Sequence, residues 1–450
     1  MVLRGFMINL KKYPLITGTL VLTFAGLISR CIGFGYRLFI SQAFGEESMG
    51  LFQLISPVVM IAFSLTGAGM QTAISRYTAS CVACHKPDVA RRYLWIGSGL
   101  CLLLSSLYAI LIYGQADFLS CKLFREPRLA PLLRITAFTF PLSSFHCCLN
   151  GYFYGMKDVR IPSLTQLAEQ LTRTGGVFLL YLLLSRKGQP TIALTAWGMV
   201  LGEIASCAIS FLSYRSLYSK PAQRPSLSSV KARSSCITLF LQLTGMAIPL
   251  SCNRLIVNLL QSVEAISIPQ GLKEFGYSTQ TALSIYGVLT GMAFSLILFP
   301  SAFTQSASVL LLPEVTQAAA SSHREQMKTT IYRSISASIA LGIFCGLGFF
   351  IFGPLAGELL FSSLLAGTFI RQLSFLCPFL YLHATLSSIL HGLKKAGLSL
   401  FINVFSLLLR LFFTLYFIPR VGIVGYLWGL LCSELLSAGL HLLFIQKSIE

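Results

Sequence analysis

Two arginines end an apolar segment near the start of the chain, where a membrane would exclude their charge. The segment begins as "LITGTLVLTFAGLI" and continues as "SRCIGFGYR", which contains Arg30 and Arg37. They are seven positions apart, or two helical turns, so both guanidinium groups lie along one face of a helix. A guanidinium presents a planar fork of N–H donors that binds phosphate oxygens in pairs. The pair therefore indicates a site for an anionic group.

Two further arginines extend this hypothesis. Arg254 lies within the seventh apolar segment, and Arg76 lies where the second one ends. Ionisable groups inside a membrane are costly and face a partner or a watery cavity, and the first segment offers no acidic partner to Arg30. We therefore predict a basic cavity lined by Arg30, Arg254, Arg37 and Arg76. The alternative, which fits Arg37 and Arg76 best, is that the side chains reach out to lipid headgroups.

Two arginine–glutamate combinations indicate ion pairs instead. Arg173 and Glu203 fall in adjacent apolar segments, and Arg410 and Glu434 repeat that arrangement later in the chain. A site for one asymmetric substrate has little use for two copies of the same pair. We therefore interpret both pairs as structural, with each pair joining two helices inside the membrane. The alternative is that one of them acts on the substrate.

Other chemical motifs are weak. The five residues "CVACH" at 81–85 match the pattern of covalent haem attachment, but the charge distribution places them in the cytoplasm, so we interpret the match as chance. His146, His383 and His391 each stand alone on an apolar face, as packed histidines do. No ATPase-type phosphate loop and no Ser-His-Asp motif occurs. The sequence thus predicts no catalytic residue, no metal site and no cofactor.

Membrane-spanning helices are the elements that would position these residues. Of the 450 residues, 55% are hydrophobic and 11% are charged, whereas soluble domains have about 25% charged residues. An α-helical span needs about 20 apolar residues, and such runs recur along the chain. We predict an all-α polytopic membrane protein with about twelve helices, near residues 15–37, 49–75, 93–114, 130–153, 162–184, 192–214, 237–263, 281–312, 331–353, 366–391, 397–418 and 421–445.

The basic residues predict the orientation of these helices. Of the 34 Lys and Arg, twenty fall in segments on the side of the N-terminus, nine fall on the other side and five lie within spans. Because basic residues favour the cytoplasmic side, both termini are predicted to be cytoplasmic, in the cell membrane. The net charge of +19 is therefore a topology signal, and its dispersal over many short loops argues against nucleic-acid binding.

An internal repeat divides the chain into two halves. Pro141, Gly155, Lys157 and Arg173 recur at the same spacing as Pro378, Gly392, Lys394 and Arg410. We predict a six-helix lobe at 1–218, a cytoplasmic linker at 219–235 and a second six-helix lobe at 236–450, facing one another across a central cavity. In this arrangement Arg30 and Arg254 lie on corresponding helices and border the cavity from opposite sides. Such an architecture is typical of transporters that work by alternating access.

Several motifs resemble one transporter superfamily over nearly the whole chain. They are "SRCIGFGYR", "FGEESMGLFQL", "GAGMQTAISRY", "SIYGVLTGMAFSLILFPSAFTQSASVLLLPEV" and "LHGLKKAGLSLFINVFSLLLR". They are similar to the multidrug/oligosaccharidyl-lipid/polysaccharide (MOP) flippases, on the branch of stage V sporulation protein B and MurJ-like proteins. One departure is the helix count, because MurJ-like members usually have fourteen helices and use the extra pair for the lipid tail.

The resemblance implies export of a polyprenyl-diphosphate-linked saccharide, without ATP, for cell-wall, spore-cortex or surface polysaccharide synthesis. It also implies that the arginines bind the diphosphate; Arg30 and Arg37 match the family motif, and Arg254 and Arg76 match it less closely. Coupling to an ion or to the membrane potential, and a functional link to cell-wall synthases, would follow. The alternatives are a cation- or proton-coupled multidrug antiporter of the same superfamily, a membrane enzyme acting on the same lipid, and a scaffold subunit.

Overall fold

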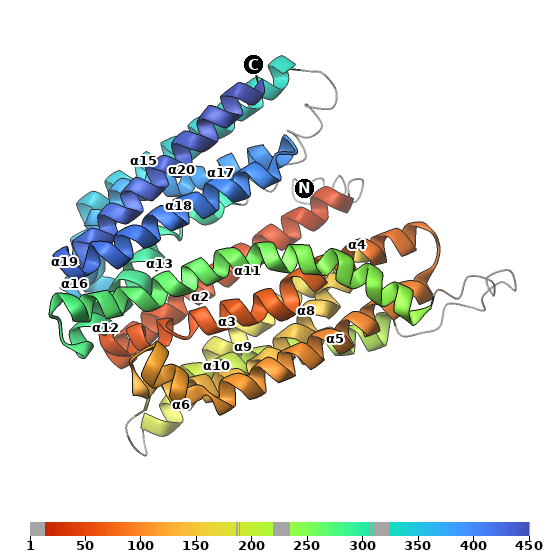
Figure 1. Ribbon diagram of the computed structural model, residues 1–450, viewed down its shortest axis with the longest axis horizontal. Helices are drawn as coiled ribbons and strands as arrows, with labels where there is room; N and C mark the ends of the chain where they lie inside the picture. Colours follow the sequence, from red (N-terminus) through yellow and green to blue (C-terminus); the bar gives the residue numbers. More distant parts are fainter. Residues whose placement is uncertain are drawn as a thin grey trace, which may run out of the picture. The chain divides into compact units, whose positions relative to one another are not determined.

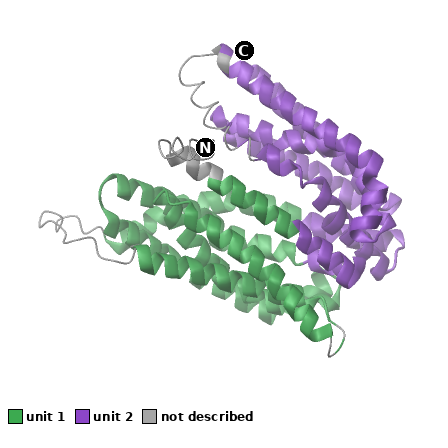
Figure 2. Cartoon of the chain, turned by 180° about the vertical axis from the view of Figure 1, so that it is seen from behind, with its two compact units in different colours: residues 1–33, 55–262 green, residues 34–54, 263–450 purple. Residues whose placement is uncertain are grey.

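Helices form all the regular secondary structure in the part of the chain that the computed structural model describes (Figure 1). That part comprises residues 14–185, 188, 190–218, 235–305, 308, 311 and 324–449. By their internal contacts the residues divide into two compact units, residues 1–33 with 55–262 and residues 34–54 with 263–450 (Figure 2). Two long helices contribute to both units, α2 (Pro14–Gln53) and α11 (Cys236–Phe275).

The remaining helices belong to one unit each. Unit 1 contains α3 (Ser56–Phe63), η1 (Ser64–Ala68), α4 (Gly69–Ala83), α5 (Pro87–Gly114), α6 (Ala116–Phe118), η2 (Leu119–Leu123), η3 (Pro127–Leu129), α7 (Ala130–Ala137), α8 (Thr139–Gly155), α9 (Arg160–Ser185), α10 (Ala193–Ser213) and η4 (Tyr214–Tyr218). Unit 2 contains α12 (Thr279–Gly287), η6 (Val288–Ala293), α13 (Phe294–Ile297), α15 (Arg324–Phe361), α16 (Leu364–Leu373), η7 (Ser374–Leu376), α17 (Cys377–Gly392), α18 (Ala396–Tyr416), α19 (Ile418–Val421) and α20 (Ile423–Ile449).

The described residues contain nine helices long and apolar enough to span a membrane, and they number ten if the segment Pro127–Ala137 and α8, which meet at a bend of 41°, make up one span. The two other long helices are α2 and α9. They carry charges within their length, among them Arg30 and Arg37 on α2 and Glu169 and Arg173 on α9. Together these helices account for the predicted twelve, and the all-α membrane fold is confirmed.

The core of unit 1 forms where α4, α5 and α8 meet. Buried Ile74, Leu94 and Phe153 belong to one apolar cluster that joins these helices. The approach is close because α8 presents glycine at the contact: a Cβ added at Gly151 would lie 2.6 Å from the carbonyl oxygen of Gln71. Small residues let helix backbones approach closely in membranes, so the glycine positions of α8 determine how near it lies to α4.

Unit 2 has a corresponding apolar core. Ile331, Leu386 and Ile402 come from α15, α17 and α18 and are fully or almost fully buried in one cluster. The backbone at the end of α17 also resembles that at the end of α8. Lys157 and Lys394 have φ values of 59° and 61°. The residue after each lysine donates an equivalent backbone hydrogen bond, from Asp158 N to Phe153 O and from Lys395 N to Leu390 O. Two positions of the predicted repeat thus have the same left-handed conformation.

The boundaries of the compact units differ from those of the predicted repeat. Residues 34–54 pack with the second unit, and the first two thirds of α11 pack with the first. Units defined by contacts report packing, whereas a repeat is a statement about symmetry, so the division at 1–218 and 236–450 stays a prediction. Of the predicted linker, residues 219–234 lie outside the described part of the chain.

Candidate functional site

Unit 1 contains a polar cluster within its membrane-spanning helices. Arg173 of α9 forms an ion pair with Glu169, one turn earlier on the same helix. Glu203 of α10 lies 3.7 Å from His146 of α8, measured between Oε2 and Nδ1. Asn150 and Thr165 complete the cluster, at 2.8 Å and 3.4 Å from His146 Nε2. All these side chains come from three neighbouring helices that pack against one another.

This geometry corrects the predicted partner of Arg173. The sequence repeat predicted Glu203, yet the ion pair that the structure shows for Arg173 is with Glu169, and Glu203 lies beside His146 instead. A cavity of about 180 Å³ separates the two predicted partners, because both Arg173 and Glu203 line it together with Thr66 and Ser144. Glu169 is the residue that the sequence interpretation missed, although its position four residues before an arginine is a signal for a helical ion pair.

Unit 2 contains a second charged cluster with a different geometry. Arg410 of α18 forms an ion pair with Glu264 of α11 in which two guanidinium nitrogens each meet one carboxylate oxygen. The Nε–Oε1 distance is 2.7 Å and the Nη2–Oε2 distance is 2.8 Å. Tyr426 of α20 donates a hydrogen bond of 2.8 Å to the same carboxylate. The predicted partner Glu434 is farther, 4.0 Å from Nη1. The main partner of Arg410 is therefore Glu264, which is not one of the residues that recur in the two halves.

The two clusters share one composition, a guanidinium with two carboxylates. The third member differs because Glu169 lies on the arginine's own helix and Glu264 lies on α11. In each cluster the arginine and its two carboxylates are mostly buried, with 20% of Arg173 and 17% of Arg410 exposed. Buried charges need such partners because an unpaired charge in a low-dielectric interior is very costly. The structural interpretation of these residues stays a prediction.

The four arginines predicted to bind substrate have different surroundings. Arg30, Arg76 and Arg254 are exposed at the protein surface, and Arg37 is half-buried. Within the described residues, no carboxylate pairs with Arg37, Arg76 or Arg254. The structure thereby separates these cations from Arg173 and Arg410, whose charges are compensated. Guanidinium groups that keep their N–H donors available can bind an anionic ligand.

The position of Arg254 follows from the packing of α11. Asn258 donates hydrogen bonds to Ser64 Oγ at 2.6 Å and to the Met60 carbonyl at 3.2 Å. Near the other end of this contact, a Cβ added at Gly69 would lie 2.4 Å from the Ala247 carbonyl oxygen. Helix α11 is thus held along α3, η1 and α4.

Arg30 and Arg254 therefore share unit 1, although the sequence placed them on two facing lobes. Arg37 lies beyond the boundary at residue 33, in the segment of α2 that packs with unit 2. The sequence could not show this because the homology of two helices in a repeat does not decide which bundle each helix packs against. In the described residues no group of His, Cys, Asp and Glu could bind a metal ion.

The sequence has relatives among proteins of polysaccharide synthesis. Residues 15–300 match the model of the family described as polysaccharide biosynthesis protein. Stage V sporulation protein B of Bacillus subtilis is 26% identical over 97% of this chain and 85% of that protein. The sporulation protein YkvU of the same bacterium is 20% identical over 97% and 96%. The lipid II flippase MurJ, also from Bacillus subtilis, is 19% identical over 74% and 64%.

The fold is that of solved MOP transporters. A multidrug resistance MATE family transporter of this superfamily, in its inward-facing conformation, aligns with a TM-score of 0.72 over 94% of both chains at 15% identity. A MOP transporter from Pyrococcus furiosus, described as having a binding pocket of reversed polarity, aligns with a TM-score of 0.63 over 96% of both chains at 15% identity. The chain thus belongs to the polysaccharide biosynthesis protein family, it is similar to stage V sporulation protein B and MurJ, and its fold is that of the solved MOP transporters.

Proposed function

We propose that the protein translocates a polyprenyl-diphosphate-linked saccharide across the cell membrane by alternating access. The observation that carries this proposal is a set of three arginines, Arg37, Arg76 and Arg254, in a chain of the polysaccharide biosynthesis family. In the part of the chain that the structure describes, no carboxylate pairs with any of the three. A diphosphate offers oxygens on two phosphorus centres, which guanidinium groups bind in pairs. Arg30 belongs to the same proposed site because it precedes Arg37 by two turns on α2.

The relatives support the same class of substrate. MurJ is named for flipping lipid II, and the names of two relatives refer to sporulation. We extend this to a precursor of cell wall, spore cortex or surface polysaccharide, which peptidoglycan or polysaccharide synthases would consume on the outer side. The distribution of basic residues predicts that both termini are cytoplasmic. The full sequence contains no ATPase-type phosphate loop. An ion gradient or the membrane potential therefore drives the translocation.

A multidrug antiporter is the main competing function, because the MATE transporters share the fold. Carriers of organic cations need carboxylates that are free to bind them. Among the described residues, Glu169 and Glu264 are engaged by Arg173 and Arg410, whereas Glu203 lies beside His146 and lines the cavity of about 180 Å³ in unit 1. The exposed Arg76 and Arg254 favour an anionic substrate over a cationic one.

A flipping measurement with Arg254 variants tests the proposal. The purified chain is reconstituted in liposomes with a fluorescent polyprenyl-diphosphate saccharide, and the fraction reaching the opposite leaflet is followed over time. Arg254→Gln should slow transfer at least tenfold, since a hydrogen bond to a charged group contributes about 1.5–3 kcal/mol. The matched control is Arg92→Gln, a change at an exposed arginine of α5 outside the proposed site.

Depletion of the protein in cells gives a second reading. Polyprenyl-linked precursors should accumulate on the cytoplasmic face when the chain is removed. Unchanged precursors, together with altered resistance to cationic dyes, would instead establish the antiporter. Normal flipping by folded Arg254→Gln would leave the transport function standing but remove Arg254 from the substrate site.

A further inference from the structure

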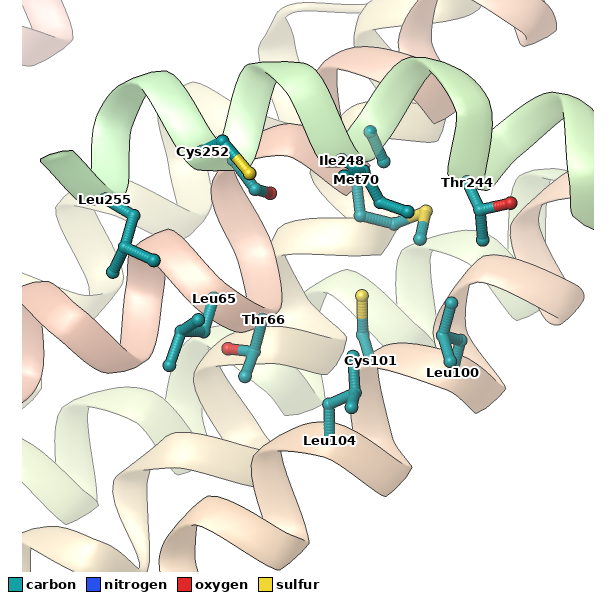
Figure 3. Close-up of a pocket in the computed structure, with 12 residues that line it drawn as sticks. Leu65, Thr66, Met70, Leu100, Cys101, Leu104, Thr244, Ile248, Cys252 and Leu255 are labelled. Atoms are coloured by element: carbon teal, nitrogen blue, oxygen red, sulfur yellow. The ribbon is translucent and has the colours of Figure 1, made fainter.

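An apolar cavity of about 210 Å³ lies in unit 1 beside α11. Three segments surround it: the continuous junction of η1 with α4, the middle of α5 and the first half of α11 (Figure 3). Its walls consist mostly of aliphatic side chains and thiols, from Leu65, Thr66, Met70, Leu100, Cys101, Leu104, Thr244, Ala247, Ile248, Ser251, Cys252 and Leu255. Among the residues that the structure describes, no charged side chain lines it.

The lining predicts a hydrocarbon occupant. Two of its hydroxyl groups are already engaged, because Thr66 donates to the Ala62 carbonyl and Thr244 donates to the Phe240 carbonyl. Space walled by apolar groups does not retain water, and an empty cavity forfeits dispersion contacts on every side. A short stretch of hydrocarbon chain has this size and chemistry.

The helix that lines one side of the cavity also carries a cation. Cys252 and Leu255 line it, and Arg254 stands between them in sequence, one turn of α11 beyond the lining residue Ser251. Helix α11 is fixed here, since Asn258 is hydrogen-bonded to Ser64. A ligand with an anionic group directly joined to an apolar chain could therefore contact the guanidinium and the cavity together.

We propose that this cavity holds the isoprene units nearest the diphosphate of the lipid carrier, while Arg254 binds the diphosphate itself. The inference rests on the proposed function and adds a binding site for the part of the polyprenyl chain that adjoins the diphosphate. In a prenyl diphosphate the first isoprene unit is attached directly to the phosphate oxygen. In a phospholipid, a glycerol and two ester groups separate the phosphate from the acyl chains, and those esters would need polar partners that this lining does not offer.

Filling the cavity should remove the contribution of the prenyl chain to binding. The full chain is purified into nanodiscs, and the dissociation constants of geranylgeranyl diphosphate and of inorganic diphosphate are measured. Leu104→Trp occupies the cavity from α5, and Thr244→Trp occupies it from α11 in case the first variant folds poorly. The matched control is Leu103→Trp, at the neighbouring position of α5, which is 64% exposed and does not line the cavity.

Geranylgeranyl diphosphate should bind about tenfold more weakly to the filled variants than to the wild type and to Leu103→Trp, the lower end of what a changed hydrophobic pocket does. Inorganic diphosphate should bind all of them alike. If both filled variants keep wild-type affinity, the cavity does not take the prenyl chain, whereas the proposed function stands. Wild-type protein that binds neither diphosphate would overturn the proposed substrate as well. If phosphatidylglycerol displaces geranylgeranyl diphosphate at equal concentration, the cavity is a general lipid site and the inference fails.

Discussion

Arg410 shows how a buried guanidinium can depend on a partner that the sequence repeat does not indicate. Its two short contacts are to Glu264, and its distance to Glu434 is 4.0 Å. Replacing Glu264 with glutamine removes the charge from the close partner and leaves the cation largely uncompensated. Breaking a buried ion pair on one side is strongly destabilising. We expect Glu264→Gln to lower the free energy of unfolding by about 3 kcal/mol.

Denaturant titration of the protein in detergent measures this loss. Glu434→Gln is the matched comparison, because it removes a carboxylate of the same type from the same cluster at the longer distance. It should be less destabilising than Glu264→Gln. An equal or larger loss for Glu434→Gln would return Glu434 to the place that the sequence repeat assigned it, as the main partner of Arg410.

The turns that end α8 and α17 each contain a residue with a strained, left-handed backbone. Lys157 and Lys394 adopt the left-handed conformation, which disfavours side chains bearing a Cβ and favours glycine. Lys157→Gly and Lys394→Gly should each raise the free energy of unfolding by about 0.5–1 kcal/mol, as relief of the Cβ contact exceeds the added entropy of the unfolded chain. Stability is measured by denaturant titration in detergent.

A neighbouring position provides the control for these turns. Met156 has a φ of −75°, so Met156→Gly relieves no strain and should be destabilising. A loss of stability in both lysine variants would mean that the lysine side chains contribute contacts that exceed the strain of their backbone.

The sequence predicted the helices well and their packing poorly. Hydropathy indicates only the apolar part of each helix. It predicted a helix at 15–37, whereas α2 extends over Pro14–Gln53 and continues into the charged residues that follow the apolar stretch. The non-helical backbone of Gly45, at φ 79°, interrupts that helix and has no hydropathy signal. Nor could the sequence show that Glu264 reaches Arg410, because 146 residues separate them. The close pairing of Glu169 with Arg173 was readable from their spacing.

The arginines of the candidate site were found from their sequence positions, but not their grouping. A charge inside an apolar segment is visible without a structure. Whether that charge has a partner can depend on a neighbouring helix, and this is what separates Arg254 from Arg410, whose partner Glu264 lies on α11. Membership of a compact unit also depends on contacts distant in sequence, such as those that hold Asn258 to Ser64.

At the scale of the whole molecule, native cysteines allow a test of orientation. Cys84 lies in the turn between α4 and α5, and Cys121 lies in η2; both are exposed. The distribution of Lys and Arg places the first turn in the cytoplasm and the second segment outside. A membrane-impermeant maleimide applied to intact cells should therefore modify Cys121 and leave Cys84 unmodified, as read by mass spectrometry of the labelled peptides.

Inverted membrane vesicles supply the reciprocal measurement, because they expose the cytoplasmic side to the same reagent. Labelling should then move to Cys84, while permeabilised membranes should give both adducts and show that each thiol can react. Modification of Cys84 in intact cells would reverse the whole topology and place both termini outside. The direction of the proposed transport would be undetermined in that case, since a cytoplasmic precursor must meet the site from the side on which it is made.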